Sequence, residues 1–432
     1  MLKLYFKQAW QLLKQNKLFC SIYIIGTGLA IAMVLFLAIL YYIKIAPVYP
    51  ETNRNRIVVV SLLEEQSIDK SSMSSGALSH KAVKEMFYTL KTPEVVSAVL
   101  LSYEENFVAL TGGELKQVSV EYTDAAFWQV FSFSFMNGKP YSEEEFASGI
   151  PVVVVSESLS KQLFGTTESV GKRFELNFRE YRVCGVVKDV SYLTPSTYAQ
   201  IWLPYTCNKD YEQTFGSMGL IGPMKVYMLA KSSKDFPAIS KEVAEKERTL
   251  NATEKEYNLH LHGQPDPYWE SIFRYHSNQD IDWKELIKSN LLLLALLLLV
   301  PIINLSGMIA SRVGKQVEEM GIRKVFGASK RALLSQLLYE NLFLTFCGGL
   351  LGLLFSYLMV FLCRNWFSDL FVEWVSPLPE GVNVALTPSM LINPTVFLLT
   401  FLVCLILNTL STLLPAWKSL QRNIVDSLSI NK

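Results

Sequence analysis

The chain has 432 residues and a formal net charge of +1, so it lacks the basic excess that is typical of nucleic-acid-binding proteins. Half of its residues are apolar, 18% are charged, and the apolar residues are concentrated in a few long stretches. These features exclude a wholly water-soluble protein and favour a membrane protein that also carries a polar domain.

Four stretches of the chain contain no charged residue and are each long enough to cross a bilayer. A bilayer core of about 30 Å requires about 20 residues of α-helix. The run LLLLALLLLV has no polar face, which argues against a buried helix of a soluble protein. We therefore predict four transmembrane helices, at 18–43, about 289–311, 341–363 and about 394–415.

The distribution of lysine and arginine predicts the orientation of these helices. Residues 1–17 carry four lysines and no acidic residue, the loop 312–331 carries six basic residues against two glutamates, and the tail 418–432 is also basic. The positive-inside rule places these three segments in the cytoplasm. The first span is too long for the apolar core of a signal peptide, so we expect an uncleaved anchor.

Residues 44–285 then lie outside the cytoplasm and are numerous enough to form a hydrophobic core of their own. They carry 32 acidic and 25 basic residues. The pattern predicts strands at 56–63, 117–122, 152–155, 181–187, 201–204 and 225–230, and helices at 79–90, 124–131, 157–164 and 235–250. We expect an α+β domain with two lobes, a hairpin turn at 111–114 and a polar loop at 66–76.

The segment GTTESVGKR (165–173) is similar to a phosphate-binding loop but departs from it in two ways. Five residues separate its glycines where a P-loop has four, and Arg173 stands where Ser or Thr would hold magnesium. We interpret the segment as a turn between a helix and a strand. The sequence predicts no catalytic residue, no bound metal and no cofactor in this chain.

Two histidines are the best candidates for a metal site. His260 and His262 lie two residues apart in LHLHG, so both side chains can share one face of a strand. A fixed third ligand is not evident, and we favour ordinary solvated histidines. A membrane-anchored metal hydrolase remains a minor alternative. Whether Cys184 and Cys207, which share the external side, form a disulfide is left open by the sequence.

The predicted spans contain no Asp, Glu, Lys, Arg or His. Ion-coupled and proton-coupled transporters usually carry such groups near the middle of the membrane. We therefore interpret the membrane helices as elements that transmit mechanical force rather than as an ion pathway. Gly348, Gly352 and Ser356 follow a spacing of small residues that lets another helix approach closely. This spacing predicts helix packing and marks a candidate dimer interface.

The loop 312–331 is more structured than a topological anchor requires. Val313, Val317 and Met320 recur at helical spacing, and Ser329 is suited to cap the helix that follows. A bent helix with mixed charge and an apolar stripe is suited to docking in a groove of another protein.

The segment EEMGIRKVFGASKRALLSQLLYEN resembles the signature of the MacB/FtsX-type ABC transporter permeases, whose usual form is E-x-G-I-R-K-A-x-G-A. The external run from VSVEYTDAAFWQVFSFSF to YRVCGVVKD resembles the MacB-like periplasmic core domain of these permeases. LPAWKSLQRNIVDSL resembles their C-terminal end, and the order of the parts agrees. Val325 stands in place of the commoner alanine.

The resemblance implies partners and a role for the charged loop. Family members dimerise in the inner membrane and bind ATPase domains, so we expect a second permease copy or paralogue and an ATPase in trans that binds the ATP. Membrane lipids and a periplasmic protein are further expected partners. By analogy the loop would be a coupling helix, with ATPase contacts at Glu319, Gly321, Ile322, Arg323, Lys324, Val325, Gly327, Ala328 and Ser329.

The resemblance thus implies an α-helical membrane protein with four transmembrane helices and a large α+β extracytoplasmic domain inserted between helices 1 and 2. This MacB-like domain, residues 44–285, would be followed by an FtsX-like permease domain, 286–417, and a cytoplasmic tail. We expect a non-enzymatic permease subunit of the bacterial inner membrane, with both termini cytoplasmic, that exports or extracts a peptide, amphiphile, drug or lipoprotein. The alternative is FtsX-like mechanotransmission to a periplasmic cell-wall enzyme or sensor.

Overall fold

The structure is a computed structural model that describes residues 14, 17–102, 104–109, 114–274, 279–296, 329–363, 390 and 393–420. The chain divides into two compact units, which are considered one at a time. The first consists of residues 1–42, 282–364 and 388–432, and the second of residues 43–281 and 365–387.

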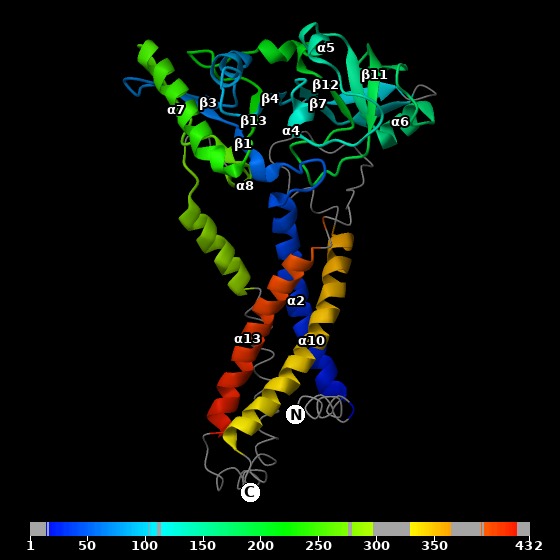
Figure 1. Cartoon of the computed structure of the whole chain (residues 1–432), viewed down its shortest axis with the longest axis vertical. Coiled ribbons are helices and arrows are strands. Elements are labelled where there is room, and N and C mark those ends of the chain that lie inside the picture. Colours follow the sequence, from blue (N-terminus) through cyan, green and yellow to red (C-terminus); the bar gives the residue numbers. More distant parts are fainter. Residues whose placement is uncertain are drawn as a thin grey trace. The chain divides into compact units, whose positions relative to one another are not determined.

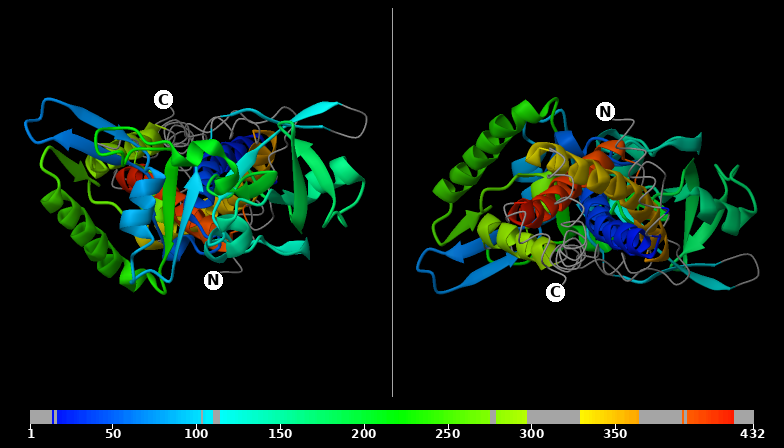
Figure 2. Two further views of the ribbon diagram at one scale, coloured as in Figure 1. Left: turned by 90° about the horizontal axis from the view of Figure 1, so that it is seen from above. Right: turned by 90° about the horizontal axis from the view of Figure 1, so that it is seen from below.

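The first unit is helical. Its long helices are α2 (Lys17–Ile45, which passes into the second unit at Ile43), α10 (Lys330–Leu362) and α13 (Pro394–Leu420). They run side by side, together with a helix over residues 283–296 (Figures 1 and 2). α2 carries no charge between Lys17 and Lys44, so nothing in its sequence interrupts an apolar helix.

Two of the described helices are long and apolar enough to cross a membrane, at Cys20–Ile45 and Leu338–Leu362. α13 contributes a shorter apolar stretch, Pro394–Ile406, and residues 297–311 of the expected second span lie outside the described residues. The count of four spans therefore remains a prediction.

The apolar stretch of α10 begins shortly before the third expected span. The apolar stretch of α10 starts at Leu338 and so includes Glu340, which is 3% exposed. Its Oε1 atom accepts a hydrogen bond of 3.0 Å from Nε2 of Gln336. The expected span 341–363 itself contains no Asp, Glu, Lys, Arg or His, and Glu340 directly precedes it. The prediction placed Glu340 outside the span because the uncharged run begins at Asn341.

The second unit is an α+β domain built on one twelve-stranded sheet, which confirms the predicted fold class of the external part. In spatial order its strands are β15 (Asp266–Pro267), β1 (Ile57–Val60), β13 (Met224–Leu229), β4 (Val95–Leu100), β7 (Val120–Thr123), β12 (Ile201–Pro204), β9 (Val152–Ser156), β11 (Arg179–Val187), β10 (Arg173–Leu176), β5 (Asn106–Ala109) and β6 (Leu115–Val118), with β8 (Phe135–Gly138) paired to β11. A smaller sheet has the order β14 (Tyr257–His260), β2 (Leu63–Ser67) and β3 (Met73–Gly76).

Helices connect these strands. They are α3 (His80–Ala82), α4 (Phe127–Val130), α5 (Glu143–Ala147), α6 (Glu157–Phe164), α7 (Phe236–Thr253) and α8 (Tyr268–Ser271). α6 follows the fully buried strand β9, begins where the Ser156 hydroxyl accepts a hydrogen bond from Leu159 N, and ends at Gly165. α6 and α7 lie toward opposite ends of the domain (Figure 2).

The core of the domain is rich in aromatic rings. The run AAFWQVFSFSF forms α4, the loop after it and the first residue of β8, and two of its rings pack edge-on against Trp202 of β12. The ring centroids of Trp128 and Phe133 lie 6.3 and 5.3 Å from that of Trp202, which is fully buried. Large rings in this arrangement contribute strongly to stability because each buries much apolar surface.

Several local predictions about the domain are corrected by the structure. The expected strand 117–122 is interrupted at Ser119, whose carbonyl accepts hydrogen bonds from Gln200 N and Ile201 N. The expected loop 66–76 contributes to the paired strands β2 and β3. The expected helix 79–90 is a single α turn, α3, followed by a π-helical segment, Val83–Phe87.

Candidate functional site

The predicted coupling loop lies almost entirely outside the described residues. This applies to Glu319, Gly321, Ile322, Arg323, Lys324, Val325, Gly327 and Ala328. Ser329 is described, is exposed and directly precedes α10, which begins at Lys330. The role of the loop in docking remains a prediction. The structure does describe α10, the helix that follows the loop.

α10 approaches α2 closely through glycines. A Cβ atom on Gly352 would lie 2.7 Å from the backbone oxygen of Gly28, and one on Gly348 would lie 3.0 Å from Thr27 Cβ. Real Cβ atoms do not approach a backbone oxygen this closely, so only glycine fits at Gly352. Ser356 continues the same row, is fully buried, and donates a hydrogen bond to Leu353 O.

The small residues predicted for helix packing thus contact another helix of the same chain. Gly348 and Gly352 face α2, whereas a Cβ atom on Gly349 would meet the ring of Phe401 on α13. Ile31 and Val34 of α2 belong to a buried cluster with Cys404 of α13. Whether a second subunit also packs on this region remains a prediction.

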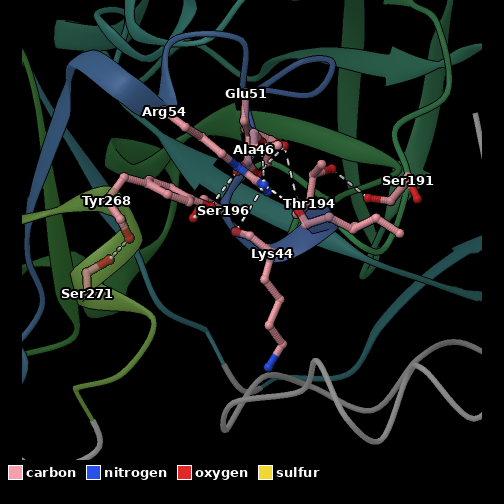
Figure 3. Close-up of polar contacts among 11 residues, drawn as sticks. Lys44, Ala46, Glu51, Arg54, Ser191, Thr194, Ser196, Tyr268 and Ser271 are labelled. Carbon is pink, nitrogen blue, oxygen red and sulfur yellow. Dashed lines mark hydrogen bonds and ion pairs between the residues drawn. The ribbon is translucent and has the colours of Figure 1, made fainter. Parts of the chain in front are cut away.

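A buried ionic cluster holds the C-terminal end of α2 (Figure 3). Nη1 of Arg54 donates hydrogen bonds to the backbone oxygens of Ile43 (2.6 Å), Lys44 (3.1 Å) and Ala46 (2.9 Å). These include carbonyls that a helix leaves without partners in its last turn. The Lys44 side chain points away from the cluster, so only its carbonyl takes part (Figure 3).

Glu51 connects this cap to two further segments of the domain. Its Oε2 atom accepts hydrogen bonds from Arg54 Nε at 2.7 Å and from the Tyr268 hydroxyl of α8. Its Oε1 atom accepts a hydrogen bond of 2.9 Å from Thr197 Oγ1. The hydroxyl of Tyr268 is also 3.1 Å from Ser196 Oγ, and its ring centroid lies 4.9 Å from Arg54 Cζ.

The charged side chains of the cluster are removed from water. Glu51 and Arg54 are 0% and 2% exposed. Burial by itself lowers the pKa of Arg54, but Glu51 and Tyr268 outweigh burial and raise this pKa above its ordinary value. Burial also raises the pKa of Tyr268 well above its ordinary value, so this hydroxyl stays a hydrogen-bond donor. The geometry is that of a buried ion pair held in a fixed position.

The segment between α2 and β1 is itself fastened to the domain. Asn53 Nδ2 donates a hydrogen bond to Val130 O, and Ser132 N donates one to Pro50 O. The Tyr49 hydroxyl accepts a hydrogen bond of 3.1 Å from Ser134 N. These contacts lead from the segment to α4 and the residues that follow it. The end of α2 therefore enters the domain through a well-bonded segment rather than a free linker.

The two histidines do not share a strand as predicted. His260 ends β14, whereas His262 follows it with a φ of +47° and lies 3.2 Å from Glu64 Oε2 through its Nε2 atom. Among the described residues no group of three or more His, Cys, Asp or Glu side chains could hold a metal.

Two other predictions about the domain concern the cysteines and the glycine-rich turn. Cys184 and Cys207 are free thiols in the structure, and burial raises the pKa of Cys184 to about 12. The segment 165–173 is the predicted turn between a helix and a strand, since it joins α6 to β10.

The Glu51–Arg54 cluster was not identified from the sequence. Its only local signal is a glutamate and an arginine three residues apart, shortly after a predicted span. Such pairs are common at protein surfaces, and their burial depends on Thr197 and Tyr268, which lie far along the chain.

Comparisons with known proteins cover both units. A family model described as "MacB-like periplasmic core domain" matches residues 21–246, more than half of the chain. A second, described as "FtsX-like permease C-terminal", matches residues 291–424 and so includes the loop 312–331.

Individual relatives are distant. An uncharacterized ABC transporter permease, YknZ of Bacillus subtilis, is 25% identical over 268 residues, which is 62% of this chain and 64% of the relative. The macrolide export ATP-binding/permease protein MacB of Mannheimia succiniciproducens is 25% identical over 276 residues, 63% of this chain and 39% of the relative. The chain thus matches less than two thirds of the length of each. The solved extracellular domain of YknZ covers 46% of this chain and all of that domain, at 15% identity and a TM-score of 0.32.

Proposed function

Because this chain belongs to the family of ABC transporter permeases that join a MacB-like periplasmic core domain to an FtsX-like permease region, we propose that it is a membrane subunit driven by a partner ATPase. ATP hydrolysis by that partner would move the membrane helices and, through them, the extracytoplasmic domain. The work done is the export or extraction of a peptide, amphiphile, drug or lipoprotein at the outer face of the cytoplasmic membrane.

The observation that supports this proposal is the close packing of α10 on α2. The loop 312–331 ends at α10, α10 contacts α2 through Gly348 and Gly352, and the last residues of α2 belong to the extracytoplasmic unit. Close backbone packing resists sliding, because no flexible side chain lies between the two helices to absorb the movement. A displacement at the loop would therefore be passed to α2.

The loop would dock on the ATPase with its apolar and basic residues in separate roles. Ile322 and Val325 are the anchors that would enter a groove, and Arg323 and Lys324 would face acidic groups at its rim. Buried anchors carry most of the affinity of such an interface, whereas rim charges tune the association rate and its salt dependence.

The remaining partners follow from the same family membership. We propose a dimer with a second permease copy or paralogue, and an orientation in which both termini and the loop 312–331 lie in the cytoplasm. The basic residues of the loop support this orientation through the positive-inside rule. In this assignment the chain does no bond-breaking chemistry, and the nucleotide is bound by the partner.

A second candidate function is the relay of force to a periplasmic cell-wall enzyme or sensor. It is favoured by the scarcity of charge in the two described apolar stretches, whose acidic or basic residues are Lys44 and Glu340, each near one end of its stretch. Neither span offers a chain of polar groups along which an ion or a polar solute would pass. Extraction from the outer face and force relay both need movement without such a path.

The test of the proposed function is purification of the tagged full chain in mild detergent. We expect an ABC ATPase to be recovered with it, and ATP hydrolysis to be stimulated in reconstituted vesicles. ATP-dependent loss of an amphiphile from the outer leaflet would select extraction, whereas a stimulated ATPase without such loss would select force relay. Recovery of no ATPase under conditions that keep the permease folded would contradict both functions.

A further inference from the structure

The cap on α2 is unusual in its chemistry. Helices are commonly closed at the C-terminus by a residue in the left-handed conformation, usually glycine, that satisfies the free carbonyls through backbone N–H groups. Here the side chain of Arg54 reaches back to Ile43, Lys44 and Ala46. All of these residues belong to the second compact unit, so the last residues of α2 are held by the domain.

The cap joins three segments of the domain to the helix end. Glu51 holds the Arg54 guanidinium, and it accepts hydrogen bonds from Thr197, in the segment before β12, and from Tyr268 of α8. Tyr268 is packed under the guanidinium, 4.9 Å from its Cζ atom. Rotation or withdrawal of the helix end would break several bonds at once, because Nη1 of Arg54 makes all three bonds to its carbonyls.

Stability alone does not account for this arrangement. A buried ion pair loses the hydration of both charges, and apolar residues of similar volume often serve stability as well or better. In addition, Nη2 of Arg54 is buried and has no hydrogen-bond partner among the described residues, which is a further cost. What the cluster provides instead is a fixed orientation of the helix end, because the planar guanidinium group bonds its acceptors in defined directions.

We infer that Arg54, held by Glu51, is the positioning residue that makes the extracytoplasmic domain move with the end of α2. This inference rests on the proposed function, because it assigns the residue through which ATP-driven movement of α2 would reach the domain. Without the cap, the short stretch between the helix end and Tyr49, where the bonds to the rest of the domain begin, would act as a loose joint, and movement of α2 would be lost in it.

The chain offers a matched control of the same chemistry at another place. Arg274 forms a buried ion pair with Asp266, and its Nη2 atom donates a hydrogen bond of 3.0 Å to His262 O. This pair also joins a guanidinium to a carboxylate and a backbone carbonyl, but it does not touch α2. Arg54→Gln and Arg274→Gln therefore remove similar interactions, and only the first removes the cap.

The first experiment measures the joint itself, without nucleotide. Spin labels on cysteines introduced at Leu29 in α2 and Lys241 in α7 report the distance from helix to domain in the full chain, with the native cysteines replaced. We expect a narrow distance distribution in the parent and in Arg274→Gln, and a broad one in Arg54→Gln. An Arg54→Gln distribution as narrow as that of the parent would overturn the inference.

A second pair of variants covers the case in which Arg54→Gln does not fold. Arg54→Lys keeps the positive charge, but an ammonium group cannot bond three carbonyls and Glu51 together. Glu51→Gln keeps the size of the side chain and removes its charge. Both should broaden the distribution less than full loss of the cap, and a narrow distribution in both would equally overturn the inference.

The second experiment adds ATP to the complex with its co-purified ATPase. We expect Arg54→Gln to hydrolyse ATP at the parental rate and to lose the ATP-dependent change in hydrogen exchange of the domain, whereas Arg274→Gln keeps both. Retention of that change in Arg54→Gln would refute the transmitting role. If the parent itself showed no ATP-dependent change, the proposed function would fail, and the label distances would still report whether Arg54 fixes the joint.

Discussion

The hydroxyl group of Tyr23 on α2 donates a hydrogen bond to the Oδ1 atom of Asn341 on α10, and both side chains are buried. The bond lies near the start of each described apolar stretch, Cys20–Ile45 and Leu338–Leu362. Together with the glycine contacts further along the two helices, it fixes α2 and α10 to each other at separate levels.

Tyr23→Phe should destabilise the helix pair by a modest amount. Interhelical hydrogen bonds in membranes contribute on average about 0.6 kcal/mol and at most about 1.7 kcal/mol. We expect a correspondingly small decrease in thermal stability in detergent. The combined decrease of Tyr23→Phe and Asn341→Ala should be smaller than the sum of the two single decreases, because both remove the same bond. Tyr357→Phe, at a half-buried position on α10, is the control. Full additivity of the Tyr23 and Asn341 substitutions would show that the bond contributes nothing.

Gly352→Ala should separate α10 from α2. The added Cβ atom would lie 2.7 Å from Gly28 O, so one backbone has to move. Gly26→Ala is the matched control, because its Cβ atom would meet no atom within 4 Å. Alanine there should be neutral or stabilising by up to about 1 kcal/mol through helix propensity. Thermal stability and ATP-stimulated activity of the two variants give the comparison, and equal behaviour would argue against close packing.

Ile322→Asp should release the ATPase from the permease. The substitution places an unpaired charge where an apolar anchor would be buried, and we expect a loss of at least about 2 kcal/mol in binding free energy. Arg323→Ala should weaken binding less and should reduce its dependence on salt. Recovery of the ATPase on tagged permease measures both effects. Normal insertion, ATPase recovery and activity of Ile322→Asp would show that the loop is not the coupling element.

The domain should lose stability as the pH rises toward neutrality because of Asp124. Burial raises the pKa of Asp124 to about 6, although donors that include Ser97, Ala98 N and Tyr88 oppose the shift. The folded domain therefore binds this proton more tightly than the unfolded chain, whose value is 3.8. The free energy of unfolding contributed by this group is greatest below pH 3.8 and falls by about 3 kcal/mol as the pH rises to about 6.

Denaturant unfolding of the purified segment 44–285 at several pH values measures this effect. Asp124→Asn removes the titrating group and keeps its size, so this part of the pH dependence should disappear, whatever the change in overall stability. Parallel pH profiles for the parent and Asp124→Asn would contradict the prediction.

The proposed orientation predicts which positions an impermeant thiol reagent reaches. Cysteines introduced at Glu168 and Lys255, both exposed in the domain, should react in intact spheroplasts. A cysteine at Ser329, which is exposed directly before α10, should react only after the membrane is permeabilised. Reaction at Ser329 from outside would overturn the orientation.

Much of the local structure was determined by the sequence alone. The first span was predicted at 18–43 and the helix is Lys17–Ile45, because the nearest charges, Lys17 and Lys44, bound an uncharged run. α6 spans the predicted residues 157–164, since Ser156 caps its start and Gly165 closes its end. The strands β9 and β12 also lie where β-branched and apolar runs predicted them. These features depend on neighbours within a few residues, which a single sequence displays.

The contacts on which the candidate site depends were decided by the tertiary structure. The spacing of Gly348 and Gly352 predicted close approach but could not identify α2 as the helix that approaches. Polar residues 66–76 gave no strand signal, yet β2 and β3 form because β14 completes their sheet. From the sequence alone, Glu51 and Arg54 are indistinguishable from an ordinary surface ion pair. Their partner Tyr268 lies 217 residues from Glu51, so only the folded chain brings a third segment over the end of α2 and removes both charges from water.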